Sequence, residues 1–160
     1  PQTSSLGRLF DAVAALLGIR SEVVYEGQAA IEMEALAVAG ELTYLIDNDA
    51  TEFNMRHAIR AIVDDLQKGV PTSLIAGRFH RTVAEMLANA CKGARQQSGV
   101  NLVALSGGVF QNRLLLQQLM QLLEKQDFEV HINRLVPPND GGLSFGQAAI
   151  AAARIRAELV

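Results

Sequence analysis

The feature that most constrains this fold is a short apolar run with turn residues on both sides. The run from Asn101 to Leu105 (NLVAL) lies between Ser98-Gly99 and Ser106-Gly107-Gly108. An apolar run of this length, bounded by turn residues, is typical of a strand buried in a sheet. The chain is therefore expected to place a buried strand at 101–105.

The segments after this strand alternate between helical and strand patterns. Leucines at helical spacing predict a helix over 112–126, and alternating apolar residues predict a second strand over 128–132. A loop rich in proline and glycine follows at 137–142, and an alanine-rich segment over 143–159 predicts a final helix able to pack closely against neighbours. The order strand, helix, strand, loop, helix predicts a parallel α/β layer.

The first hundred residues read mainly as helices. Apolar periodicity and glycine or proline boundaries predict helices over 5–17, 27–39, 54–67 and 71–97. The stretch 42–46 is strand-like but short, so its structure stays open, and no role is assigned to residues 41–53. The predicted fold class is helix-rich α/β with a short, partly parallel sheet.

Composition excludes several classes of protein. Of the 160 residues, 49% are hydrophobic and 19% charged, which excludes a disordered chain. The net charge of −3 argues against nucleic-acid binding, and no apolar run reaches the length of a membrane span. A single cysteine, Cys91, excludes an internal disulfide and is expected to be a core thiol. We expect one cytoplasmic domain over residues 1–160, cut from a longer chain.

The segment from Ser106 to Asn112 is the strongest candidate for a ligand site. Gly107 and Gly108 allow backbone N–H groups to approach a ligand, and the start of the next helix offers unpaired donors that favour a phosphate or nucleotide. The alternative is a tight turn in which Asn112 caps the helix. The segment is not a P-loop, because no Gly-Lys-Ser/Thr follows.

A second glycine loop lies at 139–142, before the last predicted helix. Asp140 beside two glycines suits a hard cation, or else the loop is a helix cap. Ligands of open α/β sheets bind beyond the carboxyl ends of the strands, so both loops are expected at that edge.

Asp11 and Glu32 are carboxylates on largely apolar helical segments. Burying a carboxylate there is costly unless it is paired or bound to a ligand, and sugar hydroxyls are plausible partners. The alternative is two exposed helix carboxylates, and Glu34 lies on another face of the same helix as Glu32. His57, His80 and His131 have no histidine three or four residues away, and His80 is expected to pack or hydrogen-bond within its helix.

Four segments taken together resemble the C-terminal part of the hydrogenase maturation carbamoyltransferases of the HypF family. They are SSLGRLFDAVAALLG, YEGQAAIEMEALA, ALSGGVFQNRLLL and PPNDGGLSFGQAA. Their order is also similar to the catalytic subunit of tRNA threonylcarbamoyladenosine synthase, but segments 6–11 and 25–28 favour the hydrogenase branch. The resemblance implies the second lobe of an actin/Hsp70/sugar-kinase-like, ribonuclease-H-like fold.

The resemblance also implies roles for individual residues. Asp11 and Glu32 match carboxylates near the ribose, with Gly27 and Gln28 beside them. Gly107 and Gly108 match glycines beneath the adenine nucleotide, and Asn112 matches an asparagine near it. Asp140 matches a metal ligand. Two histidines from an HxxxH motif, which is absent from this sequence, complete that metal site.

The activity implied by the resemblance is ATP-dependent carbamoyl transfer. Carbamoyl phosphate supplies the group, a carbamoyl adenylate forms, and the acceptor is the C-terminal cysteine of a HypE-type partner, toward the cyanide ligands of [NiFe] hydrogenase. The cofactors implied are ATP and a divalent metal ion. The partners implied are HypE and the N-terminal lobe, with no nucleic acid and no membrane, and the 160 residues alone are expected to be inactive. The alternatives are threonylcarbamoyl transfer to tRNA and a non-catalytic nucleotide-binding or docking module.

Overall fold

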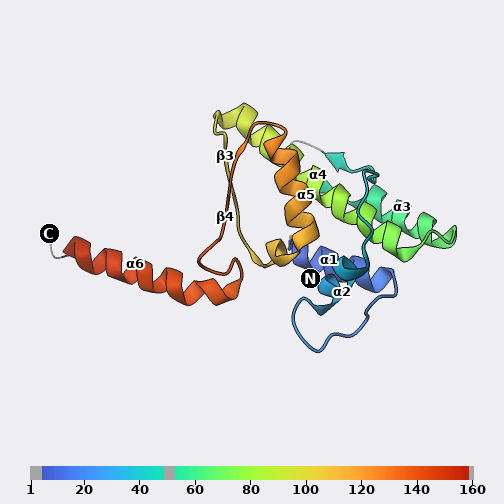
Figure 1. Cartoon of the computed structure of the whole chain (residues 1–160), viewed down its shortest axis with the longest axis horizontal. Helices are drawn as coiled ribbons and strands as arrows, with labels where there is room; N and C mark the ends of the chain where they lie inside the picture. The colour runs from blue at the N-terminus through green and yellow to red at the C-terminus, as the bar shows by residue number, and fades with distance from the viewer. Residues whose placement is uncertain (1–4, 49–52, 159–160) are drawn as a thin grey trace.

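The structure is a computed structural model that describes the chain except residues 1–4, 49–52 and 159–160. Most of the chain is helical, with two short strand pairs and two 3₁₀ turns, labelled η (Figure 1). The elements, in chain order, are α1 Leu6–Leu16, α2 Gln28–Leu36, β1 Asp47–Asn48, β2 Phe53–Asn54, α3 Arg56–Gln67, α4 Thr72–Ser98, β3 Leu102–Leu105, η1 Gly108–Gln111, α5 Arg113–Glu124, β4 Glu129–Ile132, η2 Asp140–Gly142 and α6 Leu143–Glu158.

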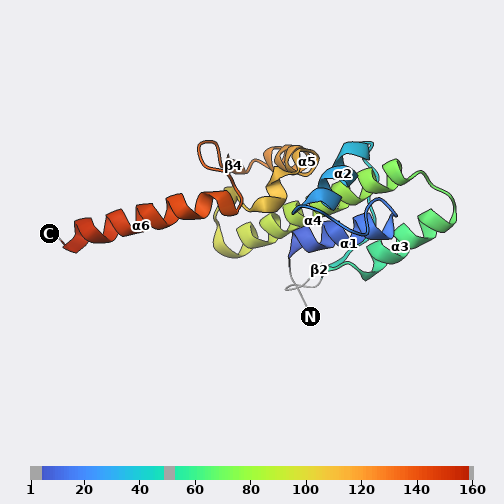
Figure 2. The same ribbon diagram turned by 90° about the horizontal axis from the view of Figure 1, so that it is seen from below.

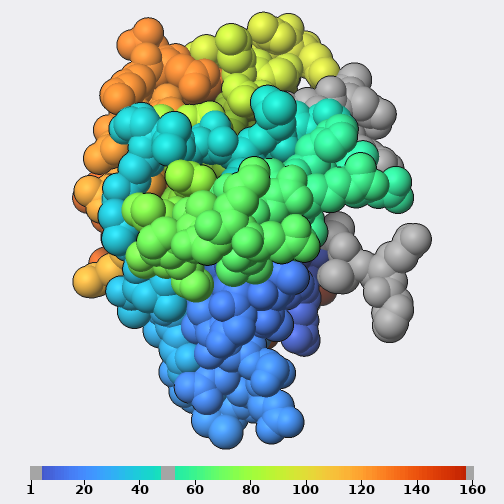
Figure 3. Space-filling model, turned by 90° about the vertical axis from the view of Figure 1, so that its right-hand side faces the viewer, coloured from blue at the N-terminus to red at the C-terminus, as the bar shows by residue number. Residues whose placement is uncertain are grey.

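Helix α4 is the centre of the core, and α2, α3 and α5 pack against it (Figures 1 and 2). Its middle turns are buried, and the Phe79 ring meets the Phe10 ring of α1 edge-on at 5.0 Å between centroids. The surface remote from α6 shows the N-terminal segment and the α3–α4 segment packed side by side (Figure 3). These helices bury their apolar faces against one another, which explains why amphipathic periodicity located them.

The ends of α1 follow local chemistry that is visible in the sequence. Ser5 Oγ accepts a hydrogen bond from the Arg8 N–H at 3.4 Å, which caps the start of the helix. Gly18, at φ +70°, ends it, and the N–H of Ile19 donates to the Ala14 carbonyl at 3.0 Å. This is a Schellman arrangement, in which glycine adopts the left-handed conformation at low cost.

Helix α2 ends earlier than the sequence predicts, at Leu36 instead of residue 39. The Val38 N–H donates to the Ser73 carbonyl of α4 at 2.9 Å, so the chain leaves the helix to lie on α4. A Cβ at Gly77 would come within 1.8 Å of the Val38 carbonyl oxygen. Only glycine therefore permits this close approach of the two segments.

The parallel strand pair that the sequence predicts is confirmed. β3 pairs with β4 in parallel, in a register that places Leu102 opposite Glu129 and Leu105 opposite Ile132. The prediction of a buried strand is wrong, because Leu105 is buried while Leu102 is half exposed. In the described part of the chain this sheet has two strands, with α5 packed against β4.

Helix α6 stands away from the other described helices, contacting η2 at its start (Figures 1 and 2). The predicted helix is confirmed, and its large apolar side chains, namely Leu143, Phe145, Ile150 and Ile155, are at least half exposed in this structure. Among the described residues, no helix is long and apolar enough to cross a membrane.

The segment before α3 also differs from the sequence prediction. Phe53 and Asn54 form β2, antiparallel to Asp47 and Asn48, so α3 begins two residues later than expected, at Arg56. The stretch 42–46 is irregular, although Tyr44 is anchored there by hydrogen bonds to α3 and α4.

Candidate functional site

The two glycine loops meet at the carboxyl ends of the two parallel strands. The Gly107 N–H donates to the Pro138 carbonyl at 2.9 Å, which joins the turn after β3 to the loop after β4. Gly107 has φ +111°, a conformation that favours glycine, and a Cβ there would meet none of the described atoms within 4 Å. The predicted common edge is confirmed, and its backbone is open at Gly107.

Asn112 is buried and holds the turn to the core. Its Oδ1 accepts the Leu115 N–H at 2.9 Å, so the alternative in which Asn112 caps the helix is confirmed. Its Nδ2 lies 2.9 Å from His80 Nε2, and His80 Nδ1 lies 2.7 Å from the Ala76 carbonyl of α4. A carbonyl only accepts, which assigns the His80 proton to Nδ1 and makes Nε2 the acceptor from Asn112. The predicted contact of Asn112 with the adenine nucleotide stays a prediction.

Burial lowers the pKa of His80, although the Ala76 carbonyl and the charge of Glu34 oppose this shift in part. The neutral ring is the form that accepts from Asn112. The sequence predicts that His80 packs or hydrogen-bonds within its own helix, and its bond to the Ala76 carbonyl confirms this. Its partnership with Asn112 was missed, because the two residues are 32 positions apart.

Glu34 makes a contact beside the candidate site that sequence reasoning missed. Its Oε1 accepts the N–H of Arg113 at 2.8 Å and the N–H of Leu114 at 3.1 Å, across 79 and 80 residues. With Asn112 on Leu115, three amides in the first turn of α5 are paired within the chain. The expectation of unpaired donors for a phosphate at this helix start is therefore wrong. No local sequence pattern predicts the contact of Glu34 with α5, because its partners come from a distant segment of the chain.

Glu32 forms a two-pronged ion pair with Arg20. Arg20 Nη2 lies 2.7 Å from Oε1 and Nε lies 2.9 Å from Oε2, while Gln28 Nε2 donates to Oε1 at 2.9 Å. These hydrogen bonds, with Arg20 first, lower the pKa of Glu32 and keep it ionised. Gln28 Oε1 accepts the Val24 N–H, and Gly27 at φ +78° precedes the helix. The predicted ribose carboxylate thus also orders the connection between α1 and α2.

Asp11 lies half-buried on α1, 3.7 Å from Arg8 Nη1. Its neighbour Phe10 packs edge-on against the His80 ring at 5.1 Å, and α1 contacts η1. Asp11 is therefore on a helix adjacent to the turn that carries Gly107 and Gly108. Its role toward ribose stays a prediction.

Asp140 is exposed at the start of η2. The preceding Asn139 is the cap of this turn, with Oδ1 accepting the Gly141 N–H at 3.1 Å, so the Asp140 carboxylate is not used as a cap. An exposed carboxylate suits a divalent cation as an oxygen ligand. No group of three His, Cys, Asp or Glu side chains among the described residues could hold a metal. Any metal at Asp140 needs further ligands from elsewhere.

This geometry agrees with comparisons to known proteins. A family described as "Carbamoyltransferase, Kae1-like Domain, second subdomain" matches residues 1–147. A crystal structure titled full-length HypF in the phosphate- and nucleotide-bound form superposes with TM-score 0.85 at 46% identity, over 92% of this chain and 24% of that one. The carbamoyltransferase HypF of Rhizobium leguminosarum bv. viciae is 41% identical over 94% of this chain.

The chain therefore belongs to the HypF carbamoyltransferase family. It spans about a fifth of the length of the curated HypF relatives that it matches. A more distant relative is the tRNA N6-adenosine threonylcarbamoyltransferase of Prochlorococcus marinus, 26% identical over 90% of this chain and 44% of that protein. The resemblance to both branches that the sequence indicates is confirmed, as is the helix-rich fold with a short parallel sheet.

Proposed function

We propose that this chain is the nucleotide-facing half of an ATP-dependent carbamoyltransferase. The observation that supports this most directly is the junction of the two glycine loops through Gly107 and Pro138. This junction lies at the carboxyl ends of parallel strands, where ligands of α/β sheets bind. The open backbone at Gly107 fits a nucleotide, because a side chain there would occupy the space that a ligand uses.

The residues of the proposed site form two groups, one for the adenine nucleotide and one for the ribose hydroxyls. Gly107 and Gly108 would let the nucleotide lie against the backbone, and Asn112 has a second amide hydrogen available beyond its bond to His80. Asp11 and Glu32 would accept hydrogen bonds from ribose hydroxyls, and the low pKa of Glu32 keeps it an acceptor. Precise positioning of ATP is the contribution we assign to this chain.

Asp140 would hold a divalent metal together with two histidines from outside this sequence. When bound, the metal would neutralise charge on the phosphates during group transfer. Because the described residues supply no complete set of metal ligands around Asp140, we expect no carbamoyl transfer from the 160 residues alone. In the whole protein, the carbamoyl group would come from carbamoyl phosphate. It would pass to the C-terminal cysteine of a HypE-type partner, in the synthesis of hydrogenase cyanide ligands in the cytoplasm.

Calorimetric titration of ATP into the full-length protein tests the nucleotide site. We expect Glu32→Ala and Asn112→Ala to weaken affinity while the proteins remain folded by thermal melt. Asn112→Ser is the matched control for the helix cap, because the serine hydroxyl can still cap α5 while the side-chain amide is lost. If ATP binds all of these variants as it binds the wild type, the site is not where we place it.

A docking module without nucleotide binding is the second candidate function. It is favoured by the internal pairing of Glu32 with Arg20 and of Asn112 with His80. It predicts that the full-length wild type does not bind ATP through this subdomain. Threonylcarbamoyl transfer to tRNA is disfavoured by the net charge of −3 and would show as tRNA binding by the full-length protein.

A further inference from the structure

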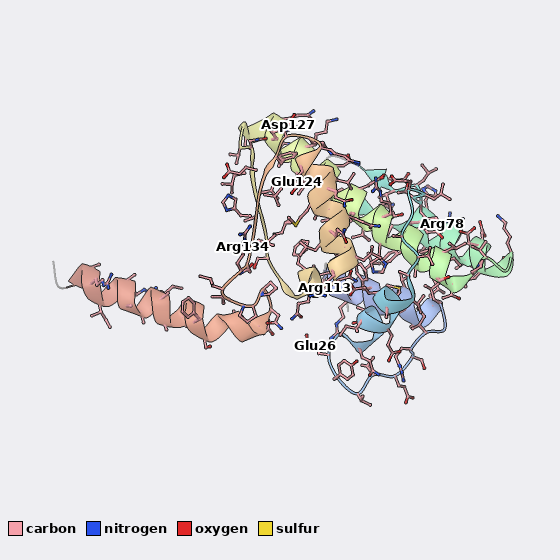
Figure 4. The ribbon with its side chains drawn as sticks, in the orientation of Figure 1. Glu26, Arg78, Arg113, Glu124, Asp127 and Arg134 are labelled. Carbon is pink, nitrogen blue, oxygen red and sulfur yellow. The ribbon has the colours of Figure 1, made fainter. Side chains whose placement is uncertain are left out.

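The proposed nucleotide site is built on helices that come from different parts of the chain. α2 carries Gln28 and Glu32 at the ribose edge, and α5 begins where the Gly107–Asn112 turn ends. α2 reaches the start of α5 through the side chain of Glu34. Arg113 marks that start in Figure 4, where the lower end of α5 lies beside α1 and α2.

Glu34 is suited to hold this spacing. A single oxygen, Oε1, accepts both the Arg113 N–H and the Leu114 N–H, at 2.8 and 3.1 Å. The side chain is half-buried. Asn112 pairs the third amide and bonds to His80 of α4. The first turn of α5 is thereby tied to α2 and α4 at once.

Residues two apart on a helix point to nearly opposite sides, about 200° apart. Glu32 points to Arg20, whereas Glu34 points to α5. Glu34 itself does not belong to the predicted ligand contacts, so its influence on them passes through the backbone of α2, which carries both carboxylates.

We infer that Glu34 is a positioning residue for the nucleotide site. By accepting both amides at the start of α5, its carboxylate sets the distance between the ribose-binding side of α2 and the Gly107–Asn112 turn. This inference rests on the proposed nucleotide binding. It assigns the effect of Glu34 on nucleotide binding to the length of the side chain, which we call its reach, and not to its charge.

Reach and charge can be separated by two conservative variants in the full-length protein. Glu34→Gln keeps the side-chain length and an Oε1 acceptor but removes the charge. Glu34→Asp keeps the charge but shortens the side chain by one methylene, about 1.5 Å. Glu34→Ala removes both. Glu26→Gln is the matched control, because Glu26 is exposed before α2 and loses the same charge (Figure 4).

The measurement is the dissociation constant of ATP by calorimetry, far below the melting temperature of each variant. We expect Glu34→Asp and Glu34→Ala to weaken binding at least about tenfold, because a site that is no longer held in place must be ordered when ATP binds, and that ordering lowers affinity. Glu34→Gln should stay within about threefold of the wild type, as should Glu26→Gln. If Glu34→Ala does not fold, the Gln and Asp pair still decides the question.

Two results would overturn the inference. If Glu34→Gln weakens binding as much as Glu34→Asp, the charge acts and not the reach. If Glu34→Asp melts at a lower temperature but binds ATP normally, Glu34 serves stability alone. Failure of the proposed function is visible separately, because the wild type would then not bind ATP or Glu32→Ala would bind it unchanged.

Hydrogen exchange adds a readout that does not depend on nucleotide. The Arg113 and Leu114 amides should exchange faster in Glu34→Asp than in Glu34→Gln, while the Leu115 amide, which Asn112 holds, should change less. Equal exchange at Arg113 and Leu114 in both variants would contradict the assigned contact.

Discussion

The two glycine loops look alike in the sequence, yet they are held in different ways. The first, from Ser106 to Asn112, is anchored by a buried asparagine to α4 and leads into a helix that Glu34 of α2 caps. The second, around Asp140, is exposed, caps itself through Asn139 and leads into the exposed helix α6. A backbone hydrogen bond from Gly107 to Pro138 links them.

Because of this difference, substitutions in the two loops should affect the stability of the fold to different extents. Side chains of the first loop contribute to the core, so changing them disturbs both the fold and any bound nucleotide. The Asp140 carboxylate is exposed, so it can be changed with little effect on the fold. Stability and activity measured together should therefore distinguish the loops, and the following predictions are ordered by expected loss of stability.

Asn112→Ala should have the largest effect on stability. It removes the cap of α5 and leaves the buried His80 Nε2 without its donor. These losses together are about 2–3 kcal/mol. Chemical denaturation of the full-length protein would measure this loss of stability, from the denaturant midpoint assigned to this domain. Asn112→Ser, which keeps a capping oxygen, should recover part of the loss, and an unchanged midpoint for Asn112→Ala would contradict the anchoring of this loop.

Gly142→Ala tests whether the exposed loop has a tight side. A Cβ there would lie 2.7 Å from the Pro137 carbonyl oxygen and 3.0 Å from a Val136 methyl. We expect a loss of about 1–2 kcal/mol from this overpacking, measured by thermal or chemical denaturation. Gly146→Ala is the control, since a Cβ there would meet none of the described atoms within 4 Å. Equal stability of both variants would show that the loop relaxes freely.

Lower pH should weaken the first loop in a way that depends on His80. Burial lowers its pKa in the folded state below the 6.5 of the unfolded chain. The stability due to the neutral ring is therefore complete above about pH 6.5 and is lost as pH falls through the folded-state pKa, because the unfolded state binds the proton first. Denaturation at several pH values should show this loss in the wild type. His80→Gln should reduce the slope, and an unchanged slope would refute the role of His80.

Asp140→Ala should have the smallest effect on stability, within about 0.5 kcal/mol, because the residue is exposed. If Asp140 is a metal ligand, the same change should abolish metal-dependent carbamoyl transfer and reduce bound metal in the full-length protein. Metal analysis and a transfer assay would check both. Normal metal content and activity would remove Asp140 from the metal site.

Much of the fold could be predicted from the sequence because local rules decide it. Ser5 and Gly18 bound α1 by capping chemistry, and leucine periodicity located α5. The early end of α2 could not be predicted, since it depends on the contact of Val38 with α4 at Gly77. The exposure of β3 could not be predicted either. It depends on which other elements cover the strand, and the residues of the strand itself do not indicate this.

The candidate site shows the same division. The sequence by itself determined where the glycine turns and the carboxylates lie along the chain, since turn geometry and helix capping depend on residues a few positions apart. Only the tertiary structure decided that Glu34 pairs the start of α5, that His80 holds Asn112, and that Arg20 holds Glu32. These partners are between 12 and 80 residues apart, and the free energy of such contacts depends on packing that brings distant segments together.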